Sequence, residues 1–424
     1  MLPMVAVLAV LLLVIGGAAV DYSRAIGQRT TMANALDAAA LTIASQLSSS
    51  IMTDEEIGES LKDAFAANLN NMGYSDIAIE NLQHNVDSDA GTVHVSSSIA
   101  IPTKFIHIGG IGPDTISVSV DTEVNYSKFD VELALVLDVT GSMSGDMETL
   151  KDAATSLVDT LIPDGTSESD SKIRISIVPY SQGVNLGEYA QAVTNGNKGT
   201  RNCVTERTGD AQYTDDPYDY DEDNEDSYFG GGSNSCASTP QMEPLTAKRN
   251  KLTTAINKLS ASGATAGQTG IAWGWYSLSP NWTNLWPTKS APGDYGDDDI
   301  LKFAIIMTDG DFNTYYDLEE NEVCTGKKKK KTCTTVKEWT QTRESEYATN
   351  VSSTRAKDLC EAMKDEGVEV YTIYFGSNSS SAGAKVMKSC ATSGSTFYMA
   401  SSDEALISAF GNIAKKVQSI YLAK

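Results

Sequence analysis

Hydrophobic residues at the start of the chain predict one long helix. Residues 1–20 are almost wholly apolar and carry no charge, and this length is close to what a helix needs to cross a bilayer. Apolar residues then recur at helical spacing from Leu36 to Leu47, so we expect the helix to continue to about residue 50. A cleaved signal peptide ending near Gly17-Ala18-Ala19 is the alternative. No basic residue precedes the apolar stretch, which favours a transmembrane anchor over residues 1–20.

The hydrophobic period changes within residues 51–127. Apolar residues first recur at helical spacing, from Ile57 to Phe65, and then alternate with polar residues from Ile77 to Tyr126. The second pattern is typical of half-buried strands. We therefore expect a small α+β module that follows a helical, pilin-like extension over residues 21–50.

Residues 128–424 show strand patterns that alternate with helix patterns. Residues 131–137 are almost continuously apolar, as in strands buried on both faces of a parallel sheet. The same reasoning predicts strands at Ile173–Tyr180, Phe303–Gly310 and Val368–Phe375, and helices at Met147–Leu161, Pro244–Ser260 and Asp403–Leu422. The fold class expected is α/β, with a doubly wound, mostly parallel sheet and insertions at about 197–243 and 315–335.

Polar side chains follow the first of these strands directly. Asp138, Thr140 and Ser142 place one carboxylate and two hydroxyls on a single turn before a helix. Ser142 alone would be read as a helix cap. The whole group lies at the carboxyl end of a strand, where open α/β sheets bind ligands. Oxygen donors with few carboxylates suit Mg²⁺, which keeps several of its waters.

Three loops together resemble one known site. Residues 138–142, Asp-Val-Thr-Gly-Ser, resemble the metal-ion-dependent adhesion site of von Willebrand factor A (vWA) domains, with Thr140 where that family more often has Ser. Gly263–Gly270 resembles the loop that supplies a threonine to this site, and the match falls on Thr265. Residues 303–310, ending in Thr-Asp-Gly, resemble the loop that carries its last aspartate, Asp309.

The vWA resemblance implies roles for these side chains. Thr140 and Ser142 would bind Mg²⁺, or Mn²⁺ or Ca²⁺, directly, and Thr265 would bind it or support a ligand. Asp138 and Asp309 would ligate the metal or orient its waters. One coordination position would remain for an acidic side chain of a partner protein.

Composition and motifs exclude several functions. The net charge of −24 argues against nucleic-acid binding, which requires a basic face. The chain has no Gly-x-Ser-x-Gly motif and no P-loop, and its three histidines all precede residue 128, which argues against a serine hydrolase or an NTPase. We expect a protein that is not an enzyme, with an uncharacterised hydrolase as a remote alternative.

The cysteines predict disulfides. There are six, with no Cys-x-x-Cys pair, so a zinc site has few ligands. Fifteen pairings are possible; we expect local closure, which would indicate an oxidising periplasm, whereas free thiols would indicate a cytosolic protein. The expected pairs are Cys203–Cys236, Cys324–Cys333 and Cys360–Cys390.

The N-terminus carries a second resemblance. Ala19-Val20-Asp21-Tyr22-Ser23-Arg24-Ala25, and then residues 35–41, resemble the start of TadE/TadG proteins of the bacterial tight-adherence (Tad, Flp) pilus-assembly systems. TadG-type members carry a vWA domain after this anchor. The resemblance implies an inner-membrane protein with its body in the periplasm or at the cell surface. Arg24 and Arg29 favour the opposite orientation by the positive-inside rule, unless basic residues precede the given start.

The two resemblances predict a membrane-anchored, exported vWA protein that assembles a Tad-type pilus or mediates surface adhesion. Its partners would be the membrane and pilus or envelope proteins that offer an acidic residue to the metal. The alternative is a structural envelope protein whose metal only stabilises the fold. Five lysines, Lys327–Lys331, could also dock on the acidic segment Asp215–Asp226 of the same or a neighbouring subunit, which would produce self-association.

Overall fold

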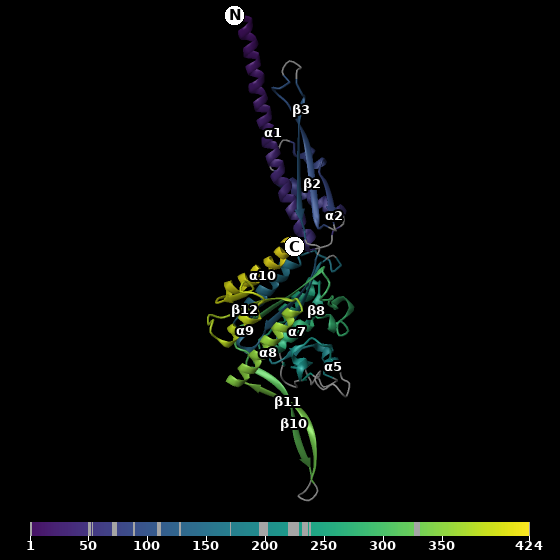
Figure 1. Cartoon of the computed structure of the whole chain (residues 1–424), viewed down its shortest axis with the longest axis vertical. Coiled ribbons are helices and arrows are strands. Elements are labelled where there is room, and N and C mark those ends of the chain that lie inside the picture. The colour runs from purple at the N-terminus through teal and green to yellow at the C-terminus, as the bar shows by residue number, and fades with distance from the viewer. Residues whose placement is uncertain are drawn as a thin grey trace. The chain divides into compact units, whose positions relative to one another are not determined.

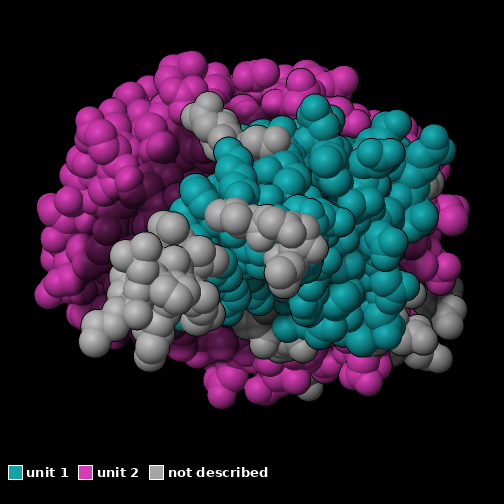
Figure 2. Space-filling view, turned by 90° about the horizontal axis from the view of Figure 1, so that it is seen from above, with its two compact units in different colours: residues 1–128, 420–424 teal, residues 129–419 magenta. Residues whose placement is uncertain are grey.

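The computed structural model defines two compact units, Met1–Lys128 with Ile420–Lys424, and Phe129–Ser419 (Figures 1 and 2). The residues described are 2–49, 52, 54–69, 74–87, 90–107, 112–126, 129–169, 171–194, 202–218, 229–230, 236, 239–325 and 331–423. Most of the acidic segment Asp215–Asp226, and Lys327–Lys330 of the lysine run, lie outside them.

The first unit consists of helices packed on an antiparallel sheet with strand order β1-β2-β3. Its elements are α1 (Leu2–Ser49), α2 (Asp54–Asn68), α3 (Ser75–Glu80), β1 (Gln83–Asp87), β2 (Thr92–Pro102) and β3 (Thr115–Asn125). Helix α1 is continuous, and its buried side chains, such as Leu36 and Ile43, pack in one cluster with Val93 and Val95 of β2. The predicted helix and the later strands are confirmed.

One prediction in this unit is wrong. Residues 77–80 were expected to begin the alternating strands, but they belong to helix α3. Asp76 in the first turn favours the helix through its dipole, and the helix buries Ala78.

The anchor predicted over residues 1–20 falls largely outside the side chains that the structure describes. Among the described residues, no helix combines the length and apolar composition that crossing a membrane requires. The side chains of residues 1–11 and of residue 13 lie outside those described.

A buried carboxylate fastens α1 to the end of β2. Asp21 accepts hydrogen bonds from the backbone N–H groups of Lys104, Phe105 and Ile106, at 2.7–3.1 Å. Burial opposes its charge, but these three donors and the nearby Arg24 outweigh that effect and lower the pKa of Asp21. The Asp21 carboxylate therefore holds α1 to the residues that follow β2 within the first unit.

The second unit contains an eight-stranded sheet. Its central strands run β13-β12-β9-β4-β5, all parallel, whereas β8 and β6 pair with β5 in antiparallel fashion. The strands are β4 (Asp130–Asp138), β5 (Ile173–Tyr180), β6 (Val184–Asn185), β7 (Cys203–Val204), β8 (Glu243–Thr246), β9 (Ile300–Thr308), β12 (Glu369–Phe375) and β13 (Phe397–Ala400). The order β8-β5-β4-β9-β12-β13 is that of a doubly wound sheet, as the sequence predicts.

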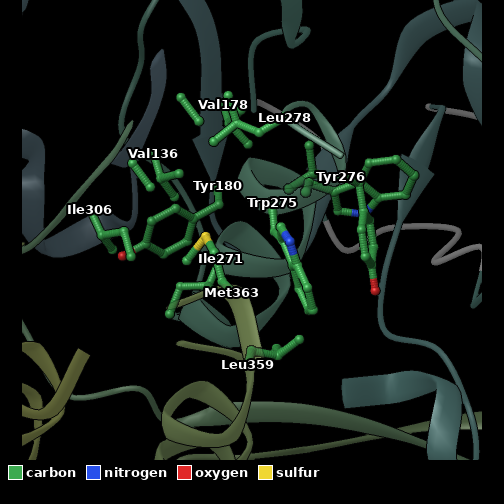
Figure 3. Close-up of a cluster of buried hydrophobic side chains, with 14 of the residues drawn as sticks. Val136, Val178, Tyr180, Ile271, Trp275, Tyr276, Leu278, Ile306, Leu359 and Met363 are labelled. Atoms are coloured by element: carbon green, nitrogen blue, oxygen red, sulfur yellow. The ribbon is translucent and has the colours of Figure 1, made fainter. Parts of the chain in front are cut away.

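Helices cover this sheet. They are α4 (Met147–Leu161), α5 (Ala190–Val193), α6 (Arg249–Asn257), α7 (Gly267–Tyr276), α8 (Glu346–Asp365), α9 (Ala382–Cys390) and α10 (Asp403–Ala423). The core includes Val136 of β4, Tyr180 of β5, Ile271 of α7 and Met363 of α8 (Figure 3). Gly270 allows α7 to approach the sheet closely, since a Cβ atom at this position would lie 2.5 Å from the Tyr180 ring.

Two stretches differ from expectation. Pro244 and Leu245 belong to strand β8, and helix α6 begins only at Arg249. Proline is tolerated in β8 because this strand pairs only with β5 among the described residues. The second insertion is larger and more regular than expected: β10 (Thr314–Thr325) and β11 (Thr332–Arg343) form a two-stranded antiparallel hairpin.

The three disulfides confirm the predicted pairing. Cys203 pairs with Cys236, Cys324 with Cys333 and Cys360 with Cys390. Cys324 and Cys333 are directly opposite each other near the tip of the β10–β11 hairpin. Cys360 and Cys390 connect α8 to α9.

Candidate metal centre

Asp138 is the buried centre of the predicted site. It is the last residue of β4, and its side chain is fully buried. One carboxylate oxygen accepts the backbone N–H of Thr140 at 2.9 Å, and the other accepts the hydroxyls of Thr308 at 2.7 Å and Tyr180 at 3.2 Å. The two hydroxyl donors, Thr308 and Tyr180, come from the carboxyl ends of the neighbouring strands β9 and β5.

Three of the other predicted side chains are joined to one another. The Thr140 and Ser142 hydroxyl oxygens are 3.0 Å apart, and the Ser142 hydroxyl donates to the Asp309 carboxylate at 2.8 Å. Asp309 follows β9 directly, so residues 167 positions apart meet at one edge of the sheet. Thr140 is buried and Ser142 is exposed, so the group opens to solvent on the Ser142 side.

The loop of Thr265 lies against the same turn. The N–H of Gly141 donates to the Gly263 carbonyl at 2.9 Å, and the N–H of Ser262 donates to the Val139 carbonyl at 2.8 Å. Gly263 has φ +87°, a backbone conformation that favours glycine. The backbone N–H of Thr265 donates to the Asn313 side chain at 3.0 Å. The Thr265 side chain is buried, and no contact between its hydroxyl and the other four predicted residues is established.

The electrostatics of the site favour a cation. Burial raises the pKa of Asp138 above its ordinary value, against the hydrogen bonds it accepts. Burial, and then the charge of Asp138, raise the pKa of Asp309 to about 7. Two carboxylates that disfavour each other's charge, joined to two hydroxyls, form a donor set that a divalent cation would satisfy. The residues present therefore fit a metal of the Mg²⁺ type.

Three supporting residues were not predicted. Thr308 and Tyr180 donate to Asp138, and the Asn313 side chain accepts from Thr265. Thr308 precedes Asp309 in the predicted loop, so its place could have been suspected, whereas Tyr180 is one more residue of an apolar strand. Asp311, two residues after Asp309, accepts the N–H of Gly383 at the start of α9, at 2.6 Å.

A second buried charge cluster joins both insertions to the core. Glu206 accepts hydrogen bonds from Gln268 of α7 at 2.9 Å, the Tyr316 backbone N–H at 2.8 Å and Arg355 of α8 at 2.6 Å. Arg355 also donates to Asp317 of β10 at 2.6 Å. Burial raises the pKa of Glu206 in spite of Arg355, whereas Glu206 and Asp317 raise the pKa of Arg355 against its burial.

Comparison with known proteins supports the N-terminal resemblance. One family profile, described as "Putative Flp pilus-assembly TadE/G-like", matches residues 1–44. The predicted TadE/TadG-like N-terminus is thereby confirmed for this segment. No curated protein matches the chain.

Several solved structures are similar to the chain. The pilus adhesin SpaC from Lactobacillus rhamnosus GG is 10% identical with a TM-score of 0.40; the match covers 80% of this chain and 34% of SpaC. The vWF domain of the pilus tip protein Mfa5 from Porphyromonas gingivalis is 13% identical with a TM-score of 0.41, covering 69% of this chain and 96% of that domain. Proximal thread matrix protein 1 from the mussel byssus, with a zinc-occupied MIDAS motif, is 14% identical with a TM-score of 0.35. The match covers 68% of this chain and 48% of that protein. The chain therefore spans about a third of SpaC.

Proposed function

We propose that this chain is a membrane-anchored, exported vWA-type protein that serves a Tad/Flp-type pilus or surface adhesion, without being an enzyme. A divalent cation, Mg²⁺ or in its place Mn²⁺ or Ca²⁺, would bind at the edge of the second unit. It would hold an acidic side chain of a pilus or envelope partner. The body of the protein would lie in the periplasm or at the cell surface, where its three disulfides are stable.

One observation carries the proposal. A segment that matches a pilus-assembly family is followed, on the same chain, by a doubly wound sheet at whose carboxyl edge Asp138, Ser142 and Asp309 converge. Thr140 and Ser142 would supply hydroxyl ligands, Thr265 a further ligand or support, and the two aspartates charge and orientation for bound waters. The metal would supply a Lewis-acidic position for the partner's carboxylate.

The test of this function is made in cells. Surface pili and adherence are compared among wild type, a full deletion, Asp138→Asn and Asp311→Asn, with protein levels checked in each. We expect the deletion and Asp138→Asn to lose piliation or adherence alike, and Asp311→Asn to keep both, because Asp311 bonds to α9 and not to the site. A deletion with normal pili and adherence would contradict the Tad assignment. Loss in the deletion but not in Asp138→Asn would leave only a structural role for the site.

Binding of Mg²⁺ should weaken as the pH falls. Asp309 titrates near pH 7 in the metal-free protein, and a metal binds the deprotonated carboxylate, so binding releases a proton below that pH. Between about pH 8 and pH 6 we expect the dissociation constant for Mg²⁺ to rise about tenfold, since one proton competes with the metal. Isothermal titration calorimetry in two buffers of different ionisation enthalpy measures both affinity and proton release. Equal affinity at both pH values, with no proton released, would contradict this assignment of Asp309.

A further inference from the structure

A surface cleft lies at the root of the β10–β11 hairpin, within the second unit. Its volume is about 370 Å³, in the lower part of the range of about 300–1,000 Å³ for small-molecule sites. Both insertions contribute to it: Tyr213 comes from the first, and Tyr315 and Asp317 come from strand β10. Helix α8, beside the hairpin in Figure 1, completes the wall with Tyr347, Asn350 and Arg355.

Aromatic rings line this cleft. Tyr347 lies in the first turn of α8 and is 67% exposed. Its ring contacts that of Tyr315 edge to face, with the centroids 6.2 Å apart. Tyr213 is half-buried on the lining. Tyr347 and Tyr213 offer flat, amphipathic surfaces that can pack on the apolar face of a ligand while their hydroxyls stay in water, whereas Tyr315 is buried beside them.

The polar groups beside these rings are fixed in position. Arg355 donates to Asp317 at 2.6 Å and to the buried Glu206, and its guanidinium lies 4.9 Å from the centre of the Tyr315 ring. Asp317 keeps 43% of its side chain exposed, so its carboxylate can accept further hydrogen bonds. The Asn350 side chain is exposed and offers both a donor and an acceptor.

The charges of the cleft restrict its ligand. Arg355 is paired with Asp317 on the lining and with the buried Glu206, so it offers an anionic ligand no unpaired charge, and the whole chain, at −24, repels one. Arg355 already occupies the face of Tyr315, which disfavours a cationic ligand there. A neutral molecule that combines apolar faces with many hydroxyl groups fits the open rings of Tyr347 and Tyr213 and the polar groups beside them.

We propose that this cleft binds a neutral carbohydrate. The C–H face of a sugar ring would pack on Tyr347 and Tyr213, while neighbouring hydroxyls would pair with the Asp317 carboxylate and the Asn350 amide. The site is separate from the metal centre, but Asn313, which binds the Thr265 backbone, immediately precedes β10. The hairpin therefore connects the carbohydrate cleft to the loop of the proposed metal site.

The experiment uses the full chain in detergent with EDTA present, so that it does not depend on the metal proposal. The probes are maltotriose, cellotriose and triacetylchitotriose at millimolar concentration, followed by saturation-transfer NMR and titration. We expect at least one of them to bind wild type, and its affinity to fall about tenfold or more in Tyr347→Ala, as is typical when a central aromatic contact is truncated. Asn350→Ala should weaken the same sugar. Tyr22→Ala is the matched control, since Tyr22 is 62% exposed on the first unit, and it should bind as wild type does.

Three results would overturn the proposal. The first is the absence of saturation transfer from the protein to any of the three sugars. Another is a sugar that binds Tyr347→Ala and Asn350→Ala as tightly as wild type. The third is a proline-rich peptide, tested in parallel, that binds through Tyr347 when no sugar does, which would make the cleft a peptide groove. Both variants lie on exposed positions of α8, so a misfolded variant is not the expected reason for loss.

Discussion

Replacing Asp138 with asparagine is expected to weaken Mg²⁺ binding by about 100-fold, the upper end of what losing a supporting group around a metal costs. The asparagine oxygen can still accept the Thr140 N–H, and its amide can donate to the Thr308 hydroxyl, while Tyr180 keeps its bond to the Met307 carbonyl at 3.1 Å. The negative charge is removed, the Thr308 hydrogen bond reverses its direction, and the bond from Tyr180 to residue 138 is lost. We therefore expect the metal-free stability to change by less than about 1 kcal/mol.

Calorimetry with the full chain, together with the shift of Tm on adding Mg²⁺, measures this effect. Asp311→Asn is the matched control, because Asp311 has the same side chain two residues after Asp309 but accepts from Gly383. It should bind Mg²⁺ like wild type. An independent measurement is the pKa of Asp309. It should fall below about 7 in Asp138→Asn, because the charge of Asp138 is one of the two main causes that raise it. Unchanged Mg²⁺ affinity in Asp138→Asn would remove Asp138 from the site.

The candidate site could be predicted because its residues follow buried strands. Asp138 and Asp309 end unbroken apolar runs, and parallel strands place their carboxyl ends at one edge. The sequence could not show that β4 and β9 are neighbours, nor that Tyr180 on β5 would donate to Asp138. Such a contact depends on strand order, and a tyrosine within an apolar strand carries no local signal for it.

The hairpin escaped prediction for a different reason. Strands are recognised by alternation of buried and exposed positions, which requires one face to be covered. Only the root of β10, residues 314–316, is buried, and residues 319–323 are exposed. With both faces in solvent, selection for alternation disappears, and the segment resembles a polar loop. The error at Pro244 has a similar origin, since a four-residue strand is too short for its period to be distinguished from that of a helix.

The buried pair of Glu206 and Arg355 gives the second large effect. Glu206→Gln leaves one acceptor oxygen where the carboxylate has two. If that oxygen keeps the Gln268 and Tyr316 N–H donors, the new NH2 group faces Arg355, which then retains only the Tyr316 carbonyl and the half-exposed Asp317. Removing one partner of a buried ion pair typically costs about 3–5 kcal/mol. We expect the free energy of unfolding to fall by about 3 kcal/mol, because Asp317 retains part of the pairing. Urea unfolding followed by tryptophan fluorescence measures it, since Trp273, Trp275 and Trp282 are buried in this unit.

Two further variants test whether the loss of stability comes from this buried pair or from any change of charge in the second unit. Glu320→Gln removes an exposed carboxylate 3.5 Å from Lys337 on the same hairpin, and exposed pairs contribute at most about 1 kcal/mol. The double variant Glu206→Gln with Arg355→Met removes both charges, and we expect it to regain much of the stability lost in the single variant. This expectation follows from the burial of both side chains, because Arg355 without Glu206 is a buried charge with fewer partners. A double variant less stable than Glu206→Gln alone would contradict this expectation, because it would show that Arg355 stabilises the fold even without Glu206.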